Sequence, residues 1–208
     1  MNVLAIGAHF DDIEIGCAGT LAKHRANGDR VVIQVITHSK YHDNNGNCLR
    51  EKDVAVREGQ EAASLLNCEL ICNYYETKHV KFGYGLIKDI EDVVEENNID
   101  LIYTHWDSDV HQDHQAIGQA TLNAGRKINY ILMYQSNLYM NTRAFNATYY
   151  VDISDYIDIK KAAILAHQSE VKKFGDEWLN FWINEAANNG KRFNVKYAEA
   201  FQPVKILV

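Results

Sequence analysis

Short apolar runs alternate with longer stretches of helical periodicity over most of the chain. Two of the runs, Val3–Ile6 and Val31–Ile33, are continuously apolar, as expected of strands that are covered on both faces. Strands and helices that alternate at this spacing favour βαβ units and a mostly parallel sheet. The predicted strands are Val3–Ile6, Val31–Thr37, Leu70–Tyr74, Leu101–His105, Ile131–Tyr134 and Tyr149–Val151. The predicted helices span about residues 15–27, 51–66, 85–97 and 113–126.

The C-terminal part continues this mixed pattern. Two helical segments, Ile157–His167 and Asp176–Asn188, precede a tail, Tyr197–Val208, that fits a returning strand. The stretch His38–Cys48 is rich in Asn and His and predicts a long functional loop. No repeat or composition break divides the chain. We therefore expect one α/β domain over residues 1–208, with helices on both faces of its sheet.

Composition and charge are those of an ordinary globular protein, with 47% hydrophobic residues, 24% charged residues and a net charge of −7. Nucleic acids and anionic membranes require clustered Lys and Arg, so we expect neither as the main partner. No apolar run approaches the ~18 residues of a transmembrane helix, and the N-terminus lacks the pattern of a signal peptide. Four cysteines without a CxxC pair agree with free thiols, and we expect a cytoplasmic protein.

The strongest chemical signal is a pair of clusters of imidazoles and carboxylates, each of which follows a predicted strand. His9, Asp11 and Asp12 follow the first strand, and the run His111–His114 follows the strand that ends at His105. Ligands bind outside the carboxyl ends of parallel strands, so both clusters are placed for one site. Each cluster alone is also typical of a helix N-terminus capped by an Asp. Their joint occurrence favours a metal site.

The residue types in these clusters suit a hydrolytic zinc site, which needs three His, Asp or Glu ligands and one open position. We expect His9, Asp12 and His114 to bind the metal, which would lower the pKa of a bound water and polarise a carbonyl. Asp11 is placed to take the proton of that water, and His111 is then free to stabilise an oxyanion. Asp11 and Asp12 would repel a pyrophosphate, which argues against a dinucleotide site at this turn.

Two motifs in these clusters resemble those of the LmbE/PIG-L family of zinc-dependent N-deacetylases. The sequence Ala8-His9-Phe10-Asp11-Asp12-Ile13-Glu14 is similar to the family signature A-H-P-D-D-x-E. Residues 109–114 are similar to its second motif, H-x-D-H with a preceding acid, and the tail segment 197–201 also looks like the family. The resemblance spans nearly the whole chain.

The resemblance implies a Rossmann-like α/β fold and one zinc ion per chain, with other divalent metals as alternatives. It implies that Asp11 is the general base and later the acid. It implies that His111 supports the tetrahedral intermediate, with Asp113 as the partner of His111. The implied metal ligands are His9, Asp12 and His114.

Five further residues are candidates for contact with the substrate. Phe10 stands where the family has Pro, so the backbone after His9 is freer, or the ring forms a wall beside the substrate. Arg50 and Arg57 flank a helix start, where each is either a substrate contact or a solvated helix residue. His105 is a pocket wall or an alternative ligand. His167 either lines the pocket or closes a helix.

These observations predict a zinc-dependent hydrolase that removes an acetyl or other acyl group from an N-acetylated amino sugar or its conjugate. Two alternatives stay open. One is another metallohydrolase, such as a phosphoesterase. The other is a non-catalytic sugar- or nucleotide-binding domain of the same fold. Members of the family often assemble, so a homo-oligomer is also compatible with the sequence.

Overall fold

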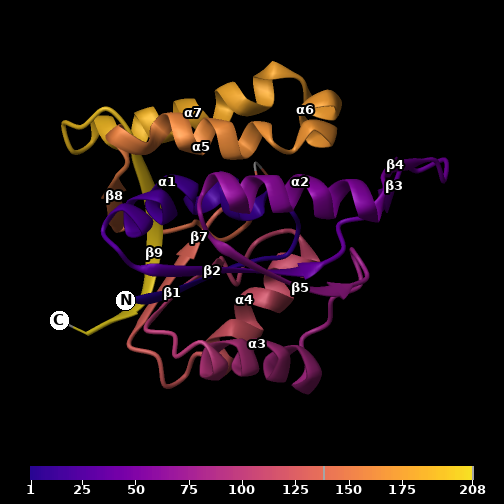
Figure 1. Cartoon of the computed structure of the whole chain (residues 1–208), viewed down its shortest axis with the longest axis horizontal. Helices are drawn as coiled ribbons and strands as arrows, with labels where there is room; N and C mark the ends of the chain where they lie inside the picture. The colour runs from indigo at the N-terminus through magenta and orange to yellow at the C-terminus, as the bar shows by residue number, and fades with distance from the viewer. Residues whose placement is uncertain (138, 208) are drawn as a thin grey trace.

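The computed structural model describes residues 1–137 and 139–207 and contains one large sheet, in the strand order β5-β2-β1-β6-β7-β9-β8 (Figure 1). Its strands are β1 (Asn2–Gly7), β2 (Arg30–Thr37), β5 (Glu69–Tyr75), β6 (Leu101–His105), β7 (Tyr130–Tyr134), β8 (Tyr149–Asp152) and β9 (Ala198–Ile206). The first five in the order are parallel, whereas β9 runs antiparallel to β7 and β8 runs antiparallel to β9. The prediction of a mostly parallel sheet is confirmed.

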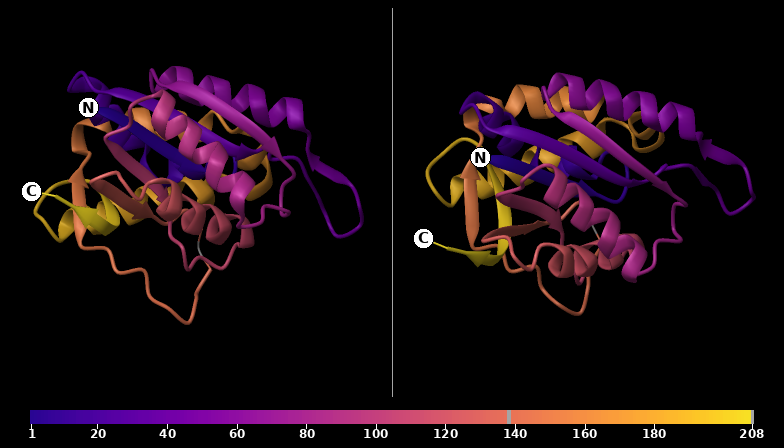
Figure 2. Two further views of the ribbon diagram at one scale, coloured as in Figure 1. Left: turned by 90° about the horizontal axis from the view of Figure 1, so that it is seen from below. Right: turned by 60° about the horizontal axis from the view of Figure 1, so that its bottom comes forward.

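Helices cover both faces of this sheet (Figures 1 and 2). One face carries α1 (Asp12–Ala26) and α2 (Lys52–Leu65), and the opposite face carries α3 (Tyr84–Glu96) and α4 (Gln112–Ala124). A further layer packs over α1 and α2 (Figure 1). It consists of α5 (Ile157–Leu165), α6 (Gln168–Phe174) and α7 (Asp176–Lys191).

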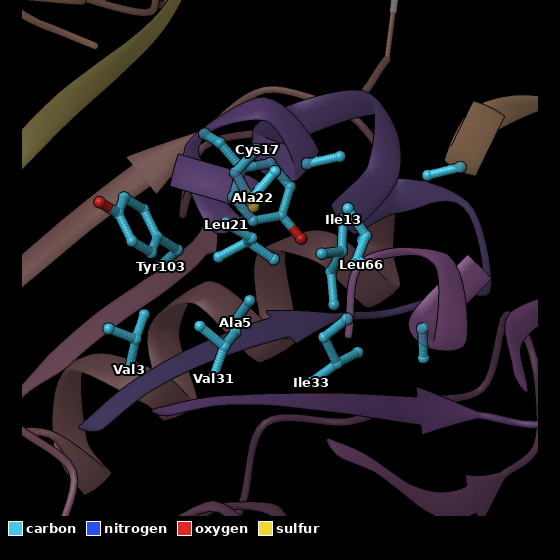
Figure 3. Close-up of a cluster of buried hydrophobic side chains, with 14 of the residues drawn as sticks. Val3, Ala5, Ile13, Cys17, Leu21, Ala22, Val31, Ile33, Leu66 and Tyr103 are labelled. Carbon is cyan, nitrogen blue, oxygen red and sulfur yellow. The ribbon is translucent and has the colours of Figure 1, made fainter. Parts of the chain in front are cut away.

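The continuously apolar run of β1 is explained by its position between two hydrophobic cores. Val3 and Ala5 point into the core beneath α1, which Figure 3 shows with Leu21 above them. Leu4 and Ile6 point into the core on the side of α3 and α4. Successive side chains of a strand face opposite sides of the sheet. Both faces of a strand that lies between two helical layers are therefore apolar.

Two elements differ from the sequence predictions. The predicted loop His38–Cys48 contains a short hairpin made of β3 (Tyr41–His42) and β4 (Cys48–Arg50). The Asp43 carboxylate accepts hydrogen bonds from backbone N–H groups inside the connecting turn, which such a polar segment allows. The seven-residue helix α6 was not predicted, because it is too short to show helical periodicity. The predicted returning strand at the tail is β9, and Val208 lies outside the described residues.

The cysteines agree with the prediction of free thiols, since all four lie in the described part of the chain and none forms a disulfide. Within residues 1–137 and 139–207, no helix has the length and apolar character required to cross a bilayer.

Candidate active site

The sheet brings the two polar clusters together because β1 and β6 are paired neighbours. Val3 lies opposite Leu101 and Ala5 lies opposite Tyr103 in a parallel register, so both strands end at the same edge. His9 and Asp12 follow β1 directly, and the second cluster begins α4, which follows β6. Residues about a hundred positions apart in sequence therefore share one edge of the sheet.

Three side chains place ligand-type atoms around a common point. The Nδ1 atom of His9 lies 3.2 Å from Oδ2 of Asp12 and 3.3 Å from Nε2 of His114. The same Nε2 of His114 lies 3.4 Å from Oδ1 of Asp12. Ligand atoms ~2.0–2.1 Å from a tetrahedral zinc ion are separated by about 3.3 Å. The His9 and His114 nitrogens have this separation, and each lies 3.2–3.4 Å from one of the two Asp12 oxygens, so the three side chains are candidates for holding one metal ion.

Ligand-type atoms lie within 4.8 Å of one another in two groups, one of His9, His111 and His114 and one of Asp12, His105 and His114. The geometry of His105 argues against its taking part. The backbone N–H of Ala8 donates to Nε2 of His105 at 2.8 Å, which occupies that lone pair. Burial, followed by the positive charge of His114, lowers the pKa of His105 to about 4. A neutral imidazole then carries its proton on Nδ1. His105 is fully buried and outside the cavity beside His9, so it does not line the pocket as the sequence suggested.

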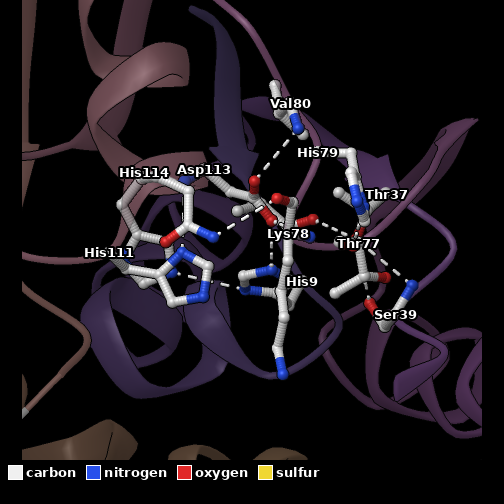
Figure 4. A network of polar contacts seen from close by, with 12 residues as sticks. His9, Thr37, Ser39, Thr77, Lys78, His79, Val80, His111, Asp113 and His114 are labelled. Atoms are coloured by element: carbon white, nitrogen blue, oxygen red, sulfur yellow. Dashed lines mark hydrogen bonds and ion pairs between the residues drawn. The ribbon is translucent and has the colours of Figure 1, made fainter. Parts of the chain in front are cut away.

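Two carboxylates lie beside the imidazole nitrogens of His9 and His114 that point away from the cluster. Oδ2 of Asp113 lies 3.1 Å from Nε2 of His9, and the carboxylate also accepts the backbone N–H groups of Lys78 and Val80 at 2.7 and 3.1 Å (Figure 4). Oδ2 of Asp109 lies 3.3 Å from Nδ1 of His114. Carboxylates in this position fix the orientation of a metal-binding imidazole and raise its basicity.

The structure corrects the expected contact of the Asp113 carboxylate. The resemblance pairs its carboxylate with His111, whereas the structure pairs it with His9. Nδ1 of His111 instead accepts the backbone N–H of Asp113 at 3.2 Å, because His111 caps α4. The short-range spacing of the motif cannot reveal this difference, which depends on where β1 delivers His9.

Asp11 precedes α1 with a backbone φ of 127°, outside the helical region, and its side chain lines the cavity. Burial raises the pKa of Asp11 to about 7, assisted by the negative charges of Asp12 and Glu170 and opposed by Arg50. A carboxylate with a pKa near neutrality can both accept and return a proton at physiological pH.

His111 faces the same cavity as a neutral imidazole. Burial, followed by the positive charges of His9 and His114, lowers the pKa of His111 to about 4. Because Nδ1 accepts the N–H of Asp113, the proton is assigned to Nε2. The ring stacks on His114 with a centroid distance of 4.6 Å. His111 is therefore a hydrogen-bond donor beside the candidate ligands.

The cavity that holds these groups has a volume of about 390 Å³, within the range of small-molecule sites. Its further walls come from segments that lie far from the two motifs in the sequence. Tyr41 belongs to the hairpin, Glu170 belongs to α6, and Ser136 donates to Oδ1 of Asp12 at 2.9 Å. Aromatic side chains of α6 and α7, Phe174, Trp178 and Trp182, close one side. A second cavity of about 540 Å³ adjoins it along a shared wall but contains neither polar cluster.

Besides His105, three more of the predicted substrate contacts lie outside this cavity. Phe10 is 2% exposed, and its ring packs over Gly59 in the core. Arg57 lies on α2 and does not line the cavity. His167 is fully buried, with Nε2 3.3 Å from a carboxylate oxygen of Glu14. These positions follow from the packing of α2 and α6, which the local sequence does not reveal.

Arg50 does line the cavity, but most of its guanidinium is engaged by the protein. Nη1 donates to the carbonyl oxygen of Phe10 at 2.9 Å, and Nη2 donates to Glu58 at 2.9 Å. Nη1 also lies 3.5 Å from Glu170, and the Arg50 side chain is only 2% exposed. Arg50 therefore holds the turn that carries Asp11, in addition to forming part of the wall.

The chain is similar in sequence to proteins of a deacetylase family. The family model described as PIG-L, GlcNAc-PI de-N-acetylase, matches residues 4–125. The uncharacterized deacetylase YaiS of Escherichia coli (strain K12) is 31% identical over 178 residues, which cover 81% of this chain and 91% of YaiS.

Two solved structures share the fold. The conserved protein TT1542 from Thermus thermophilus has a TM-score of 0.84 at 20% identity, over 99% of this chain and 95% of that chain. The N,N'-diacetylchitobiose deacetylase from Pyrococcus horikoshii has a TM-score of 0.82 at 22% identity, over 98% of this chain and 83% of that chain. Because the family model spans more than half of the sequence and YaiS matches most of it, the chain belongs to the PIG-L family of deacetylases.

Proposed function

We propose that this chain is a metal-dependent N-deacetylase that releases acetate from an N-acetylated amino sugar or its conjugate. The observation that carries the proposal is the proximity of His9, Asp12 and His114. Nδ1 of His9 lies 3.3 Å from Nε2 of His114, and the two Asp12 oxygens lie 3.2 and 3.4 Å from these nitrogens. Asp11 and His111 line the same cavity. The name of the Pyrococcus horikoshii neighbour and the description of the family model support an N-acetylated sugar as the substrate class.

The donor set of two imidazoles and one carboxylate suits zinc, and other divalent metals are alternatives. A zinc ion held there would lower the pKa of a water molecule and polarise the acetyl carbonyl. Oδ2 of Asp113 lies 3.1 Å from Nε2 of His9, and Oδ2 of Asp109 lies 3.3 Å from Nδ1 of His114. Carboxylates so placed would keep the opposite ring nitrogens directed towards the metal.

The chain's own residues supply the proton transfers and part of the charge stabilisation. Asp11 accepts a proton as the water oxygen forms its bond to the acetyl carbon. The Nε2–H of His111 donates to the carbonyl oxygen, on which negative charge develops. Asp11 then returns the proton to the sugar nitrogen as the carbon–nitrogen bond breaks. The products are acetate and a free amine.

Acetate release tests the proposal directly. Zinc-loaded protein is incubated with N-acetylglucosamine, free and in lipid- or nucleotide-linked form, with and without a chelator. We expect acetate release that the chelator abolishes. Phosphate release from a model ester, without acetate release, would instead favour a phosphoesterase.

Two substitutions test the division of roles. Asp11→Asn is expected to keep the metal and to lower kcat by about 10²–10⁴-fold, the usual contribution of a general base. Asp53→Asn, at an exposed Asp in the first turn of α2, is the matched control and should keep full activity. His114→Ala is expected to lower the metal content in elemental analysis. Full turnover by Asp11→Asn would show that another group takes the proton.

A further inference from the structure

The turn between β1 and α1 stores backbone strain next to the reactive carboxylate. Asp11 has a φ of 127°, a conformation that residues other than glycine rarely adopt. Such a conformation costs about 1–3 kcal/mol and persists only where surrounding contacts enforce it. The preceding residue is Phe10, which lacks the pyrrolidine ring that restrains the backbone of a proline. Other contacts must therefore hold this turn.

Both peptide groups of Phe10 are held by buried side chains. Its N–H donates to Oγ of Ser39 at 2.9 Å, and its carbonyl oxygen accepts from Arg50 at 2.9 Å. Ser39 is 1% exposed and Arg50 is 3% exposed, so water does not compete for these bonds. The ring of Phe10 occupies the space above Gly59, where a Cβ would lie only 2.0 Å from Cδ1 of the ring.

Ser39 is itself strained and is anchored to the end of β1. Its φ is 55°, a left-handed value at which glycine is the favoured residue. The backbone N–H of Ser39 donates to Oγ1 of Thr37 at 3.1 Å, and that hydroxyl donates to the carbonyl oxygen of Ala8 at 2.8 Å. Figure 4 shows Thr37 and Ser39 on the side of His9 opposite to His111. A glycine here would relieve the strain but would leave the N–H of Phe10 without its acceptor.

We propose that Ser39 is a positioning residue, whose hydroxyl holds the N–H of Phe10 and thereby keeps Asp11 directed into the cavity. This hydrogen bond restrains the backbone of the turn, as the ring of a proline at position 10 would restrain it covalently. A proline has no N–H, so Ser39 would have nothing to hold in a chain with proline there. The inference rests on the proposed function, because it takes Asp11 as the general base.

A double-mutant cycle of Ser39→Gly and Phe10→Pro tests the coupling. Ser39→Gly removes the hydroxyl and also relieves the left-handed strain, so we expect Tm to change by less than about 3 °C. In the zinc-loaded protein, kcat should fall about tenfold, because small misplacements of a catalytic group are costly. KM and metal content should stay within about twofold of their original values. In the Phe10→Pro background, the same change should leave kcat unaltered.

The matched control is Asn67→Gly. Asn67 has a left-handed φ of 54° in the turn between α2 and β5, at the opposite edge of the sheet from the site. This change relieves similar strain without touching the turn of Asp11, so kcat should be unchanged. A fall in kcat that equals that of Ser39→Gly would show that strain relief alone is responsible, and the proposal would be wrong.

Hydrogen exchange supplies a readout that needs neither activity nor a folded Phe10→Pro protein. Ser39→Gly should speed exchange in a peptide that covers residues 8–12 and leave α4 unchanged. Unchanged exchange there, an unchanged kcat, or an equal loss of kcat in both backgrounds would each overturn the proposal. A rise in KM in both backgrounds would instead make Ser39 a direct substrate contact. If the unaltered protein releases no acetate, the proposed function fails, while the exchange result still decides whether Ser39 holds the turn.

Discussion

At the scale of single residues, two adjacent carboxylates have opposite environments. Burial would raise the pKa of Asp12, but the positive charge of His114 and its hydrogen bond hold that pKa well below its usual range. Burial raises the pKa of Asp11 to about 7, assisted by the negative charges of Asp12 and Glu170, which Arg50 and His167 offset only in part. One acid is therefore suited to remain an anion, and the other is suited to exchange a proton. Neighbouring carboxylates with separated pKa values are a recurring sign of an acid–base site.

Gly59 leaves space for the ring of Phe10. Gly59→Ala places a Cβ 2.0 Å from the ring of Phe10, so the ring must move. We expect a loss of about 1–3 kcal/mol in the free energy of unfolding, which is typical of overpacking. Activity should fall as well, because Phe10 precedes Asp11. Urea unfolding and acetate release measure the two effects.

Gly85→Ala is the control for this substitution. Gly85 lies in the first turn of α3, where the nearest neighbour of an added Cβ is the Tyr75 hydroxyl at 3.9 Å. Alanine should therefore stabilise the helix by about 0.4–1 kcal/mol. If both variants shifted stability in the same direction, the explanation from Phe10 would not stand.

At the scale of elements, a buried ion pair ties α5 and β9 to helix α1. Nζ of Lys160 lies 2.6 Å from Oε1 of Glu199 and donates to the carbonyl oxygens of Glu14 and Ile15 at 3.0 and 2.6 Å. The Glu199 carboxylate accepts the backbone N–H groups of Gly19 and Thr20 at 3.0 and 2.7 Å. Because α1 begins at Asp12, this pair fixes the helix that carries a candidate ligand.

Removal of one partner of this pair should be costly. Lys160→Met leaves the Glu199 carboxylate buried without its cation, and we expect a loss of about 3–5 kcal/mol in the free energy of unfolding. Lys161→Met, which removes the neighbouring lysine of the exposed pair with Asp158, should change stability little. Urea denaturation of the two variants gives the comparison. Equal effects would mean that the buried pair contributes no more than a surface contact.

At the scale of the whole molecule, a metal ion would join two parts of the chain that only the folded sheet brings together. His9 and Asp12 come from the end of β1, and His114 comes from α4 after β6. In the unfolded chain these groups are far apart, so binding must favour the folded state. The stabilisation follows RT ln(1 + [L]/Kd) and is about 2.7 kcal/mol at a hundredfold excess over Kd.

Added zinc should therefore raise Tm, and a chelator should reverse the rise. The zinc-induced shift should be largely lost in His114→Ala and retained in His79→Ala. His79 is a fair control because its imidazole is 66% exposed and lies in a loop near the site. Comparing shifts rather than absolute Tm values removes the effect of each substitution on the metal-free protein. A full shift in His114→Ala would exclude this nitrogen as a ligand.

The fold was largely predictable because strand and helix periodicities are local properties of the sequence. The runs at Val3–Ile6 and Leu101–His105 indicated buried parallel strands, and the structure confirms β1 and β6 there. The hairpin around Asp43 and the helix α6 were missed, because elements this short carry little periodic signal. Both of these elements contribute to the cavity wall.

The fold class, the family and the two clusters that follow β1 and β6 could be predicted from the amino-acid sequence alone, because each depends on residues close together in the chain. The assignment of His9, Asp12 and His114 as ligands stays a prediction that the metal experiments address. The contact of Asp113 with His9 and the hydrogen bond between Ser39 and Phe10 become visible only in the folded chain. These contacts depend on side-chain directions at the junction of separate elements, and no spacing within a motif encodes them.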